Sequence, residues 1–271
     1  MKTRIIAAVA LLPLLLGIVL FLPKICTAIL FGAMAAIGAY ELLHNTGLVK
    51  NNRIVLYAVI MAVFVSLWSN MWTVYPLILM GVLTFFCILF GELLLFHTQL
   101  KFVDLAYALV AGGLLPYLLG AVVRIHSLAT GRHLILLPFV IAFLSDTGAY
   151  FAGRFLGKHK LAPVISPKKT VEGLVGGVLA AIIGVIAYCL ILRGAFGFQV
   201  NWVCVPVYGL FGSLGAVFGD LCFSVIKRQT GIKDYGNLIP GHGGILDRFD
   251  SMMVVAPLVE LLILVMPMVV K

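Results

Sequence analysis

The chain has 271 residues, of which 63% are hydrophobic and only 11% are charged, and its mean hydropathy is +1.17. This composition excludes a soluble globular domain. The formal net charge of +9 indicates anionic lipid headgroups and phosphate-bearing ligands, and we exclude nucleic acid as a partner because such a chain offers mostly lipid-facing surface.

Runs of about 18 or more apolar residues are typical of membrane-spanning helices. The sequence therefore predicts an all-α, polytopic integral membrane protein with about nine transmembrane helices. The predicted ranges are 5–22, 25–43, 54–69, 75–96, 105–123, 134–152, 174–192, 203–226 and 252–270. Lys2 and Arg4 precede the first run, but no small-residue cleavage site and soluble domain follow it, so we expect this helix to be retained.

Acidic residues divide the sequence into two parts. Residues 1–133 hold three of them, Glu41, Glu92 and Asp104, whereas residues 146–250 hold six. Charge beside apolar helices is costly unless the protein handles something charged. The sequence therefore predicts N-terminal transmembrane scaffold helices over 1–133 and a C-terminal transmembrane catalytic region, with two cytoplasmic loops, over 134–271.

Positive charge predicts the orientation in the membrane. Nine spans place the two termini on opposite sides, and fourteen Lys and Arg residues then fall on the side of the N-terminus against five on the other side. Cytoplasmic loops carry the excess of Lys and Arg. We therefore expect the N-terminus and the loops 153–173 and 227–251 to lie in the cytoplasm.

A first polar constellation lies late in the sixth predicted span. Asp146, Tyr150 and Arg154 are spaced four residues apart, so they share one face of a helix. A carboxylate inside a span is costly unless it is paired, hydrated or bound to a metal. Two interpretations follow: a functional acid, or an Asp146–Arg154 interaction at the end of the helix.

A second constellation is the segment Ser166–Gly173. Ser166 as N-cap and Pro167 at the first helical position predict the start of a helix. The positive end of that helix, with Lys168 and Lys169 beside it, would bind phosphate. Glu172 follows Lys168 by four residues and is expected to orient it. The alternative is an ordinary basic helix end on the cytoplasmic side.

The third constellation begins on the eighth predicted span. Asp220, Ser224, Lys227 and Arg228 form one polar stripe along that helix. A loop rich in glycine follows, and glycine permits tight turns and close approach of backbone N–H groups to phosphate oxygens.

Beyond this loop, Asp247, Asp250 and Ser251 are predicted to open the ninth helix and to face one way. Asp220 and Asp247 would thus flank the glycine-rich loop, and they suit Mg²⁺, a hard cation held by one or two carboxylates, waters and substrate phosphates. The alternative is a network of salt bridges with neighbouring Lys and Arg.

Three stretches of this sequence resemble the phosphatidate cytidylyltransferases, also called CDP-diacylglycerol synthases. The stretch from Ser224 to Asp250 follows that family's signature without a gap, and SDTGAYFAGR…GK (from Ser145) and SPKKTVEG (from Ser166) are similar to its other motifs. The resemblance implies a nucleotidyltransferase of the cell inner membrane whose substrates are CTP and phosphatidic acid and whose cofactor is Mg²⁺. The oligomeric state is left open, with a homodimer as one alternative.

The resemblance also implies roles for individual residues. The catalytic set is Asp220, Asp247, Lys227 and Arg248. The substrate-binding set is Ser166, Lys168, Lys169, Ser224, Arg228, Lys233, His242, Gly243, Gly244 and Arg154. The metal ligands are Asp220 and Asp247, with Asp146 and Asp250 as second candidates. We expect His242 to bind phosphate or order the loop, because a phosphate monoester with a second pKa of about 6 needs no strong general base at neutral pH.

Two other functions share some of these features. A CTP-dependent lipid kinase of the polyprenol or phytol type would use the same nucleotide and membrane, but it would transfer the γ-phosphoryl group and release CDP. An ion-coupled transporter would also carry intramembrane acids and broken helices. The charges of this chain gather in glycine-rich loops on one predicted side of the membrane, which favours an enzyme over a transporter.

Overall fold

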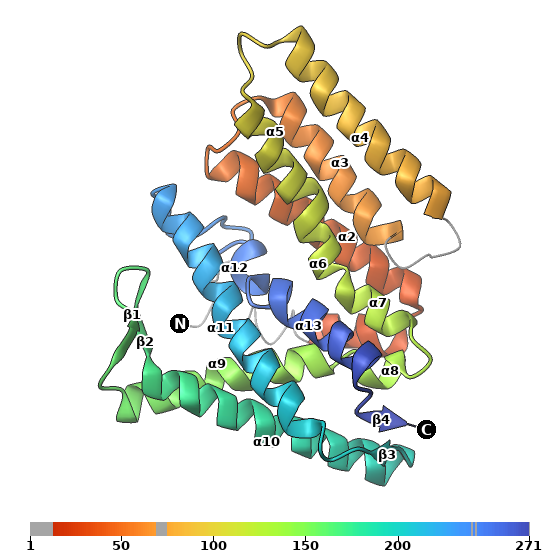
Figure 1. Cartoon of the computed structure of the whole chain (residues 1–271), viewed down its shortest axis with the longest axis vertical. Helices are drawn as coiled ribbons and strands as arrows, with labels where there is room; N and C mark the ends of the chain where they lie inside the picture. Colours follow the sequence, from red (N-terminus) through yellow and green to blue (C-terminus); the bar gives the residue numbers. More distant parts are fainter. Residues whose placement is uncertain (1–12, 69–74, 240, 242, 271) are drawn as a thin grey trace. The chain divides into compact units, whose positions relative to one another are not determined.

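The computed structural model describes residues 13–68, 75–239, 241 and 243–270. It consists mainly of helices, with a few short strands (Figure 1), and the chain divides into two compact units. Unit 1 contains Met1–Ser127 and Gln229–Phe249, and unit 2 contains Leu128–Arg228 and Asp250–Lys271. The predicted all-α class is confirmed. The predicted division into a scaffold (1–133) and a catalytic region (134–271) concerns function and stays a prediction.

Unit 1 is a set of apolar helices. Helix α2 (Lys24–Tyr40) continues into a π-helical turn, η1 (Glu41–Asn45), and packs along α3 (Asn52–Trp68), as Figure 1 shows. The other elements are α4 (Tyr75–Leu95), α5 (Phe102–Leu109), η3 (Val110–Leu114), α6 (Leu115–Leu119), α7 (Ala121–Ser127) and the short α12 (Leu246–Phe249).

Unit 2 is organised around α9 (Leu137–Leu156) and α10 (Val171–Phe196), which lie side by side in Figure 1. An antiparallel hairpin of β1 (Lys160–Ala162) and β2 (Ser166–Thr170) connects them. The other elements are α8 (Gly131–Leu134), α11 (Val205–Gln229), α13 (Met252–Val265) and a second strand pair, β3 (Gln199–Val200) with β4 (Val269–Val270).

Glycines recur every three or four residues along α11, a spacing that predicts close packing of helices, and in the structure glycines bring the helices of unit 2 into close contact. A Cβ atom at Gly177 on α10 would lie 2.8 Å from the carbonyl oxygen of Ser145 on α9, and one at Gly219 on α11 would lie 2.7 Å from that of Asp250. Only a residue without a side chain fits at such distances. These contacts hold the segments that carry the polar motifs close to one another.

Six described helical segments are long and apolar enough to cross a membrane, so this is a membrane protein. Helix α3 is also apolar but has only 17 residues, so it is shorter than these six. The first predicted span (5–22) lies partly outside the described residues. The ninth (252–270) is shorter than predicted, because α13 ends at Val265 after 14 residues. The predicted count of nine spans is therefore not confirmed.

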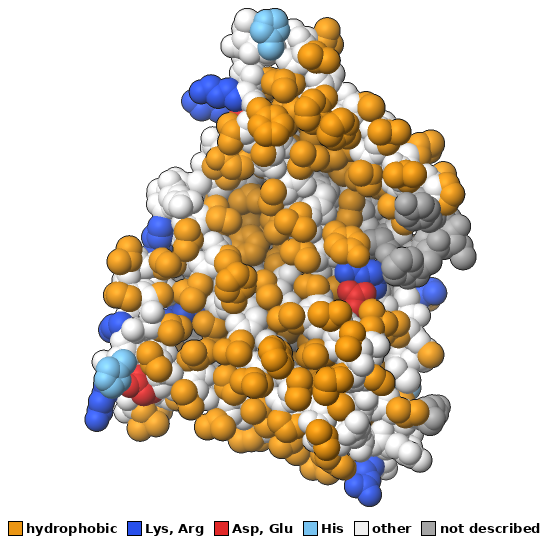
Figure 2. Space-filling model, viewed as in Figure 1, with side chains coloured by type: hydrophobic (Ala, Val, Ile, Leu, Met, Phe, Trp, Pro, Cys, Tyr) orange, Lys and Arg blue, Asp and Glu red, His pale blue; other side chains and the backbone are white. Residues whose placement is uncertain are grey.

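The outer faces of these helices are apolar. On α10, Val175, Leu179, Ile183 and Leu190 are each more than half exposed. Figure 2 shows apolar side chains over most of the visible face, with only scattered charged groups. Exposed apolar surface of this extent is suited to lipid, so the charged residues of the motifs stand out as exceptions.

Candidate active site

The hairpin before α10 corrects one prediction. The sequence predicts a helix that begins at Ser166 and Pro167, but both lie in strand β2, where Ser166 pairs with Ala162. Proline is compatible with an edge strand because its fixed φ angle suits extended backbone. The N-cap of α10 is Thr170, whose Oγ1 accepts a hydrogen bond from the Gly173 N–H at 3.1 Å. The predicted helix start is therefore wrong.

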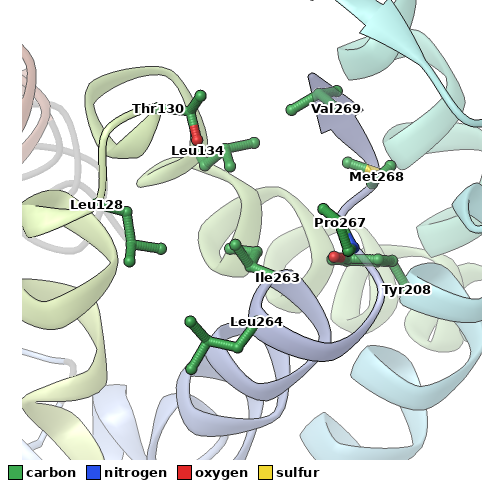
Figure 3. Close-up of a pocket in the computed structure, with 9 residues that line it drawn as sticks. All are labelled: Leu128, Thr130, Leu134, Tyr208, Ile263, Leu264, Pro267, Met268 and Val269. Carbon is green, nitrogen blue, oxygen red and sulfur yellow. The ribbon is translucent and has the colours of Figure 1, made fainter. Parts of the chain in front are cut away.

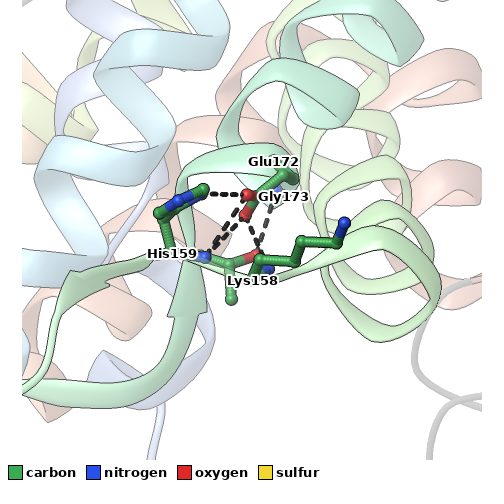
Figure 4. A network of polar contacts seen from close by, with 5 residues as sticks. Lys158, His159, Glu172 and Gly173 are labelled. Carbon is green, nitrogen blue, oxygen red and sulfur yellow. Dashed lines mark hydrogen bonds and ion pairs between the residues drawn. The ribbon is translucent and has the colours of Figure 1, made fainter.

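The first turn of α10 holds the start of the hairpin through Glu172 (Figure 4). Its carboxylate accepts hydrogen bonds from the backbone N–H groups of Lys158 at 3.1 Å and His159 at 3.2 Å, and it contacts the His159 Nδ1 at 2.6 Å. The predicted contact of Glu172 with Lys168 assumed one helix through both residues. Because Lys168 lies on the strand, Glu172 positions residues 158 and 159 instead.

Motif residues from distant segments meet in unit 2. The Lys169 Nζ lies 2.5 Å from the Asp220 Oδ2, and the Ser224 hydroxyl donates a hydrogen bond to the Asp220 Oδ1 at 3.1 Å. The Arg228 Nε donates to the carbonyl oxygen of Ile165 at 3.4 Å. The predicted polar stripe on α11 is thus confirmed for Asp220 and Ser224, and its end lies beside the hairpin.

Asp250 adds a second carboxyl group to this region. It is 8% exposed. Burial first, and then the negative charges of Asp220 and Asp146, raise the pKa of Asp250 to about 7, against the opposing effects of a hydrogen bond from the Ser251 N–H and the charge of Lys227. A bound cation would be stabilised here because it would relieve the repulsion between the carboxylates.

The carboxylates of this region suit a magnesium ion that is also bound by water and substrate phosphates. Asp220 and Asp250 supply two carboxylates, and Asp146 adds negative charge to the same region. Among the described residues, no three His, Cys, Asp or Glu side chains gather closely enough to hold a metal ion by themselves. Magnesium commonly takes only one or two protein carboxylates and completes its shell with water and substrate phosphates. The donor set therefore suits a substrate-assisted magnesium site.

The predicted helix face on α9 is confirmed for two of its three residues. The Arg154 Nη1 donates a hydrogen bond to the Tyr150 hydroxyl at 2.7 Å. Asp146, one turn before Tyr150, acts electrostatically on Asp250. Both interpretations of Asp146, a functional acid and a helix-end pair with Arg154, stay predictions.

In unit 1, Asp247 organises the glycine-rich loop. Its Oδ2 accepts hydrogen bonds from the backbone N–H groups of Tyr235 at 2.7 Å and Gly244 at 3.0 Å, and the side chain is 7% exposed. Gly243 has a φ of +85°, and a Cβ atom there would lie 2.7 Å from the same Oδ2. The loop can approach Asp247 this closely only because position 243 is glycine.

The predicted single helix through Asp247, Asp250 and Ser251 is wrong. Asp247 belongs to the short α12 of unit 1, whereas α13 of unit 2 begins at Met252. Asp220 and Asp247 likewise belong to different units. Their predicted sharing of one magnesium ion therefore stays a prediction from the sequence.

The same loop borders a polar cavity of about 380 Å³ in unit 1. The residues that line it are Lys233, Asp234, Asn237, Ile239, Gly241, Gly243 and Arg248. Lys233 and Arg248 supply two positive charges against the one negative charge of Asp234, and Arg is well suited to bidentate contact with phosphate. The cavity can therefore receive an anionic group. His242, a predicted substrate-binding residue, lies outside the described residues.

Sequence reasoning missed two residues that contact this loop. The Glu41 carboxylate accepts hydrogen bonds from the backbone N–H groups of Ile245 at 3.0 Å and Leu246 at 2.9 Å. The Asn45 Nδ2 donates to the carbonyl oxygen of Tyr235 at 2.7 Å. An acid within an apolar helix is the one signal that could have identified Glu41.

A second cavity, of about 240 Å³, lies in unit 2 (Figure 3). Its nine lining residues are Leu128, Thr130, Leu134, Tyr208, Ile263, Leu264, Pro267, Met268 and Val269, and none of them is charged. Tyr208 lies near the start of α11, whereas Asp220 lies more than three turns further along it. This cavity is therefore separate from the carboxylate cluster.

Comparison with known proteins gives a match along the whole chain. The family model described as "Cytidylyltransferase family" matches residues 2–266. A phosphatidate cytidylyltransferase of Staphylococcus saprophyticus is 35% identical over 268 residues, which cover 97% of each chain. The proteins of the same name from Staphylococcus haemolyticus and Staphylococcus aureus are 34% identical (98% of this chain, 100% of the relative) and 35% identical (97% of each).

Proposed function

We propose that this chain, which belongs to the cytidylyltransferase family, transfers the cytidylyl group of CTP to phosphatidic acid. A phosphate oxygen of phosphatidic acid attacks the α-phosphorus of CTP and forms a new P–O bond. The bond from that phosphorus to the oxygen bridging to the β-phosphorus breaks, and pyrophosphate leaves with the bonding electron pair. The attacking phosphate is largely deprotonated at neutral pH, so no strong general base is needed.

The observation that carries this proposal is the contact of Lys169 with Asp220, which itself accepts a hydrogen bond from Ser224. Phosphoryl and nucleotidyl transfer depend mainly on positioning and on stabilisation of charge. Lys169 comes from the hairpin, and Lys227 and Arg228 come from the last turn of α11. Together they supply positive charge next to a carboxylate, which is the arrangement that phosphate groups and a cation require.

We assign magnesium to the carboxylates of unit 2. Asp220 and Asp250 would hold it, with Asp146 adding negative charge, and Asp247 stays the candidate that the sequence offers from unit 1. When bound, magnesium would neutralise phosphate charge and polarise the α-phosphorus. Lys169 pairs with Asp220 in the structure and would turn its ammonium group to a substrate phosphate.

In unit 1 we assign phosphate binding to the polar cavity. Lys233 and Arg248 line it, and the guanidinium group of Arg248 can bind two phosphate oxygens at once. Gly241 and Gly243, both with positive φ angles, carry no side chain that could obstruct a ligand in this cavity. These features suit the triphosphate of CTP.

The membrane position of the enzyme follows from its lipid substrate. Phosphatidic acid keeps two acyl chains in the bilayer, so its phosphate stays at the level of the headgroups. We place the enzyme in the cell inner membrane with the loops 153–173 and 227–251 on the cytoplasmic side, where CTP is present, in agreement with the excess of Lys and Arg on that side. A homodimer remains one form of assembly, which crosslinking in native membranes would detect.

Two differently labelled forms of CTP test the proposal. Purified protein in detergent receives phosphatidic acid, magnesium and CTP labelled at either the α- or the γ-phosphorus. We expect the α-label in CDP-diacylglycerol and the γ-label in pyrophosphate. Transfer of the γ-label to the lipid, with release of CDP, would instead identify a lipid kinase and overturn the proposal.

A further inference from the structure

Glu41 is an acid from the predicted scaffold that contacts the glycine-rich loop directly. It is 3% exposed, and its two carboxylate oxygens accept hydrogen bonds from the successive backbone N–H groups of Ile245 and Leu246. A buried carboxylate is costly unless its oxygens are hydrogen-bonded. The two amides meet that requirement, and Glu41 in turn satisfies the N–H of Leu246, the first residue of α12, which has no partner within its own helix.

The local geometry of the helix supports this contact. Glu41 is the first residue of the π-helical turn η1, and Asn45 is the last. From these positions Glu41 reaches residues 245 and 246 while the Asn45 Nδ2 donates to the carbonyl oxygen of Tyr235 at 2.7 Å. Turns of this type are rare and often occur at functional sites. Here the turn lets one helix end hold the loop at two points.

Two glycines of the loop leave room for Glu41. A Cβ atom at Gly236 would lie 2.5 Å from the Glu41 Oε1, and a Cβ atom at Gly244 would collide with both carboxylate oxygens. Neither glycine has a positive φ angle, so backbone conformation does not require glycine at these positions. Glycine is required there because the Glu41 carboxylate occupies the space that a side chain would fill. The sequence suggests that such glycines approach a phosphate, but these two approach an acid of the protein itself.

The segment that Glu41 holds carries groups assigned to the reaction. Asp247 and Arg248 follow Leu246 directly, and Arg248 lines the polar cavity. Asp247 accepts hydrogen bonds from the N–H groups of Tyr235 and Gly244. Glu41 and Asp247 therefore fix four backbone amides between them, and the start of α12 cannot shift without breaking some of these bonds.

We propose that Glu41 is a positioning residue for cytidylyl transfer: it fixes residues 244–246 so that Asp247 and Arg248 are held in place before CTP binds. This inference rests on the proposed function. Pre-organisation of this kind matters because a displacement of about 1 Å in a catalytic group can lower a rate by about a hundredfold. Glu41 acts through the loop and does not itself contact the substrate.

The first test is Glu41→Gln. Glutamine has nearly the same size, but its amide nitrogen would face one of two backbone N–H donors and could not accept a hydrogen bond. We expect kcat/KM for CTP to fall by about 10- to 100-fold, with little change in the KM for phosphatidic acid, and amide hydrogen exchange at residues 244–246 to become faster. Glu92→Gln is the matched control, because Glu92 on α4 pairs with Arg53 and Tyr57 and should leave these kinetic values unchanged.

A double-mutant cycle tests the contact itself. Gly244→Ala should lower activity because the new methyl group meets the Glu41 carboxylate, and Glu41→Ala should remove that collision. The loss in the double variant should therefore be smaller than the product of the two single losses. A melting curve for each variant identifies those that fail to fold, and Glu41→Asp, which keeps the charge but shortens the reach, then replaces Glu41→Ala.

The outcomes of these tests separate the possible explanations. Wild-type kcat/KM in Glu41→Gln, or strictly multiplicative losses in the cycle, would overturn the positioning role. A lower melting temperature with unchanged activity per folded molecule would also overturn it, because Glu41 would then serve folding alone. Absence of CDP-diacylglycerol with the wild-type protein would instead refute the proposed function, and amide exchange at residues 244–246 would still report whether Glu41 holds the loop.

Discussion

The acids that hold the glycine-rich loop of unit 1 and the acids of the carboxylate cluster of unit 2 have different partners. In unit 1, Glu41 and Asp247 accept hydrogen bonds from four backbone N–H groups of one loop. In unit 2, Asp220 is paired with Lys169, and burial and neighbouring negative charge raise the pKa of Asp250 to about 7. Carboxylates that bind main-chain amides fix the shape of a loop, whereas carboxylates that face a lysine and one another can exchange partners for a cation and phosphate.

This difference separates two roles for acids within one sequence motif. Asp247 and Asp250 are three residues apart, yet they belong to different units and have different partners. The spacing of acids in the motif alone therefore does not reveal which of them shape the loop and which are available for metal. The group that each carboxylate oxygen contacts decides the role of that acid. Substitutions that remove the charge but keep the hydrogen bonds can test this distinction.

The largest effect is expected at Asp220. Asp220→Asn keeps the size of the side chain and one acceptor oxygen but removes the charge that Lys169 and a cation require. Formation of CDP-diacylglycerol should fall by about a thousandfold or more, while the free energy of unfolding changes by only about 1–3 kcal/mol. The assay is product formation against magnesium concentration, with a melting curve for each protein.

Asp104→Asn is the control for this experiment. The Asp104 carboxylate accepts a hydrogen bond from the Lys101 N–H at the start of α5 and has no proposed part in the reaction. It should keep the wild-type rate. Turnover near the wild-type value in Asp220→Asn would remove Asp220 from the metal site, and Asp250 and Asp146 would then be the carboxylates to test.

Asp247 gives the sharpest test of the difference between acids that shape the loop and acids that bind metal. Both of its loop hydrogen bonds end on Oδ2, so asparagine can keep them with its single carbonyl oxygen while it loses the charge that magnesium needs. We expect Asp247→Asn to melt near the wild-type temperature but to lose most activity, about a hundredfold or more. Asp247→Ala should lose both activity and stability. If Asp247→Asn is active and only Asp247→Ala fails, Asp247 serves the loop alone.

The raised pKa of Asp250 predicts that the stability of the protein depends on pH. Between its ordinary pKa of 3.8 and its folded pKa of about 7, the folded protein keeps a proton that the unfolded chain releases. The free energy of unfolding should therefore fall as pH rises through this window, by up to about 1.4 kcal/mol per pH unit. Melting temperatures in detergent without magnesium, from pH 4 to pH 8, measure this slope. Asp250→Asn should flatten it, and an equal slope in both proteins would contradict the assignment.

Most of the fold could be predicted from the sequence because the apolar runs and the glycine spacings are local signals. The membrane helices and the glycine contacts at Gly177 and Gly219 follow from them. The count of nine spans is not confirmed, and one reason is that an apolar run does not show where its helix stops. The run at 252–270 stays apolar to its end, but α13 stops at Val265 and Val269 pairs with Val200 in a strand.

The candidate site could be predicted where its residues share one helix, as do Asp220 and Ser224. It could not be predicted where tertiary contacts decide the outcome. Nothing local pairs Lys169 with Asp220, or connects Glu41 with Ile245, which is 204 residues away in sequence. Pattern reasoning finds which side chains carry charge, but it does not find the partner of each one when that partner lies far along the chain.

The smallest expected effect tests the corrected start of α10. Thr170 caps this helix through its side-chain oxygen, whereas Ser166 lies in strand β2. Thr170→Ala should therefore lower the free energy of unfolding by about 1 kcal/mol, and Thr170→Ser, which keeps the hydroxyl group, should recover most of the loss. Ser166→Ala is the matched comparison and should leave stability nearly unchanged, whatever it does to substrate binding. Thermal melting of the three variants decides between the two caps: a larger loss at Ser166 than at Thr170 would restore the helix start that the Ser-Pro pair predicts, and would place Lys168 and Lys169 on that helix.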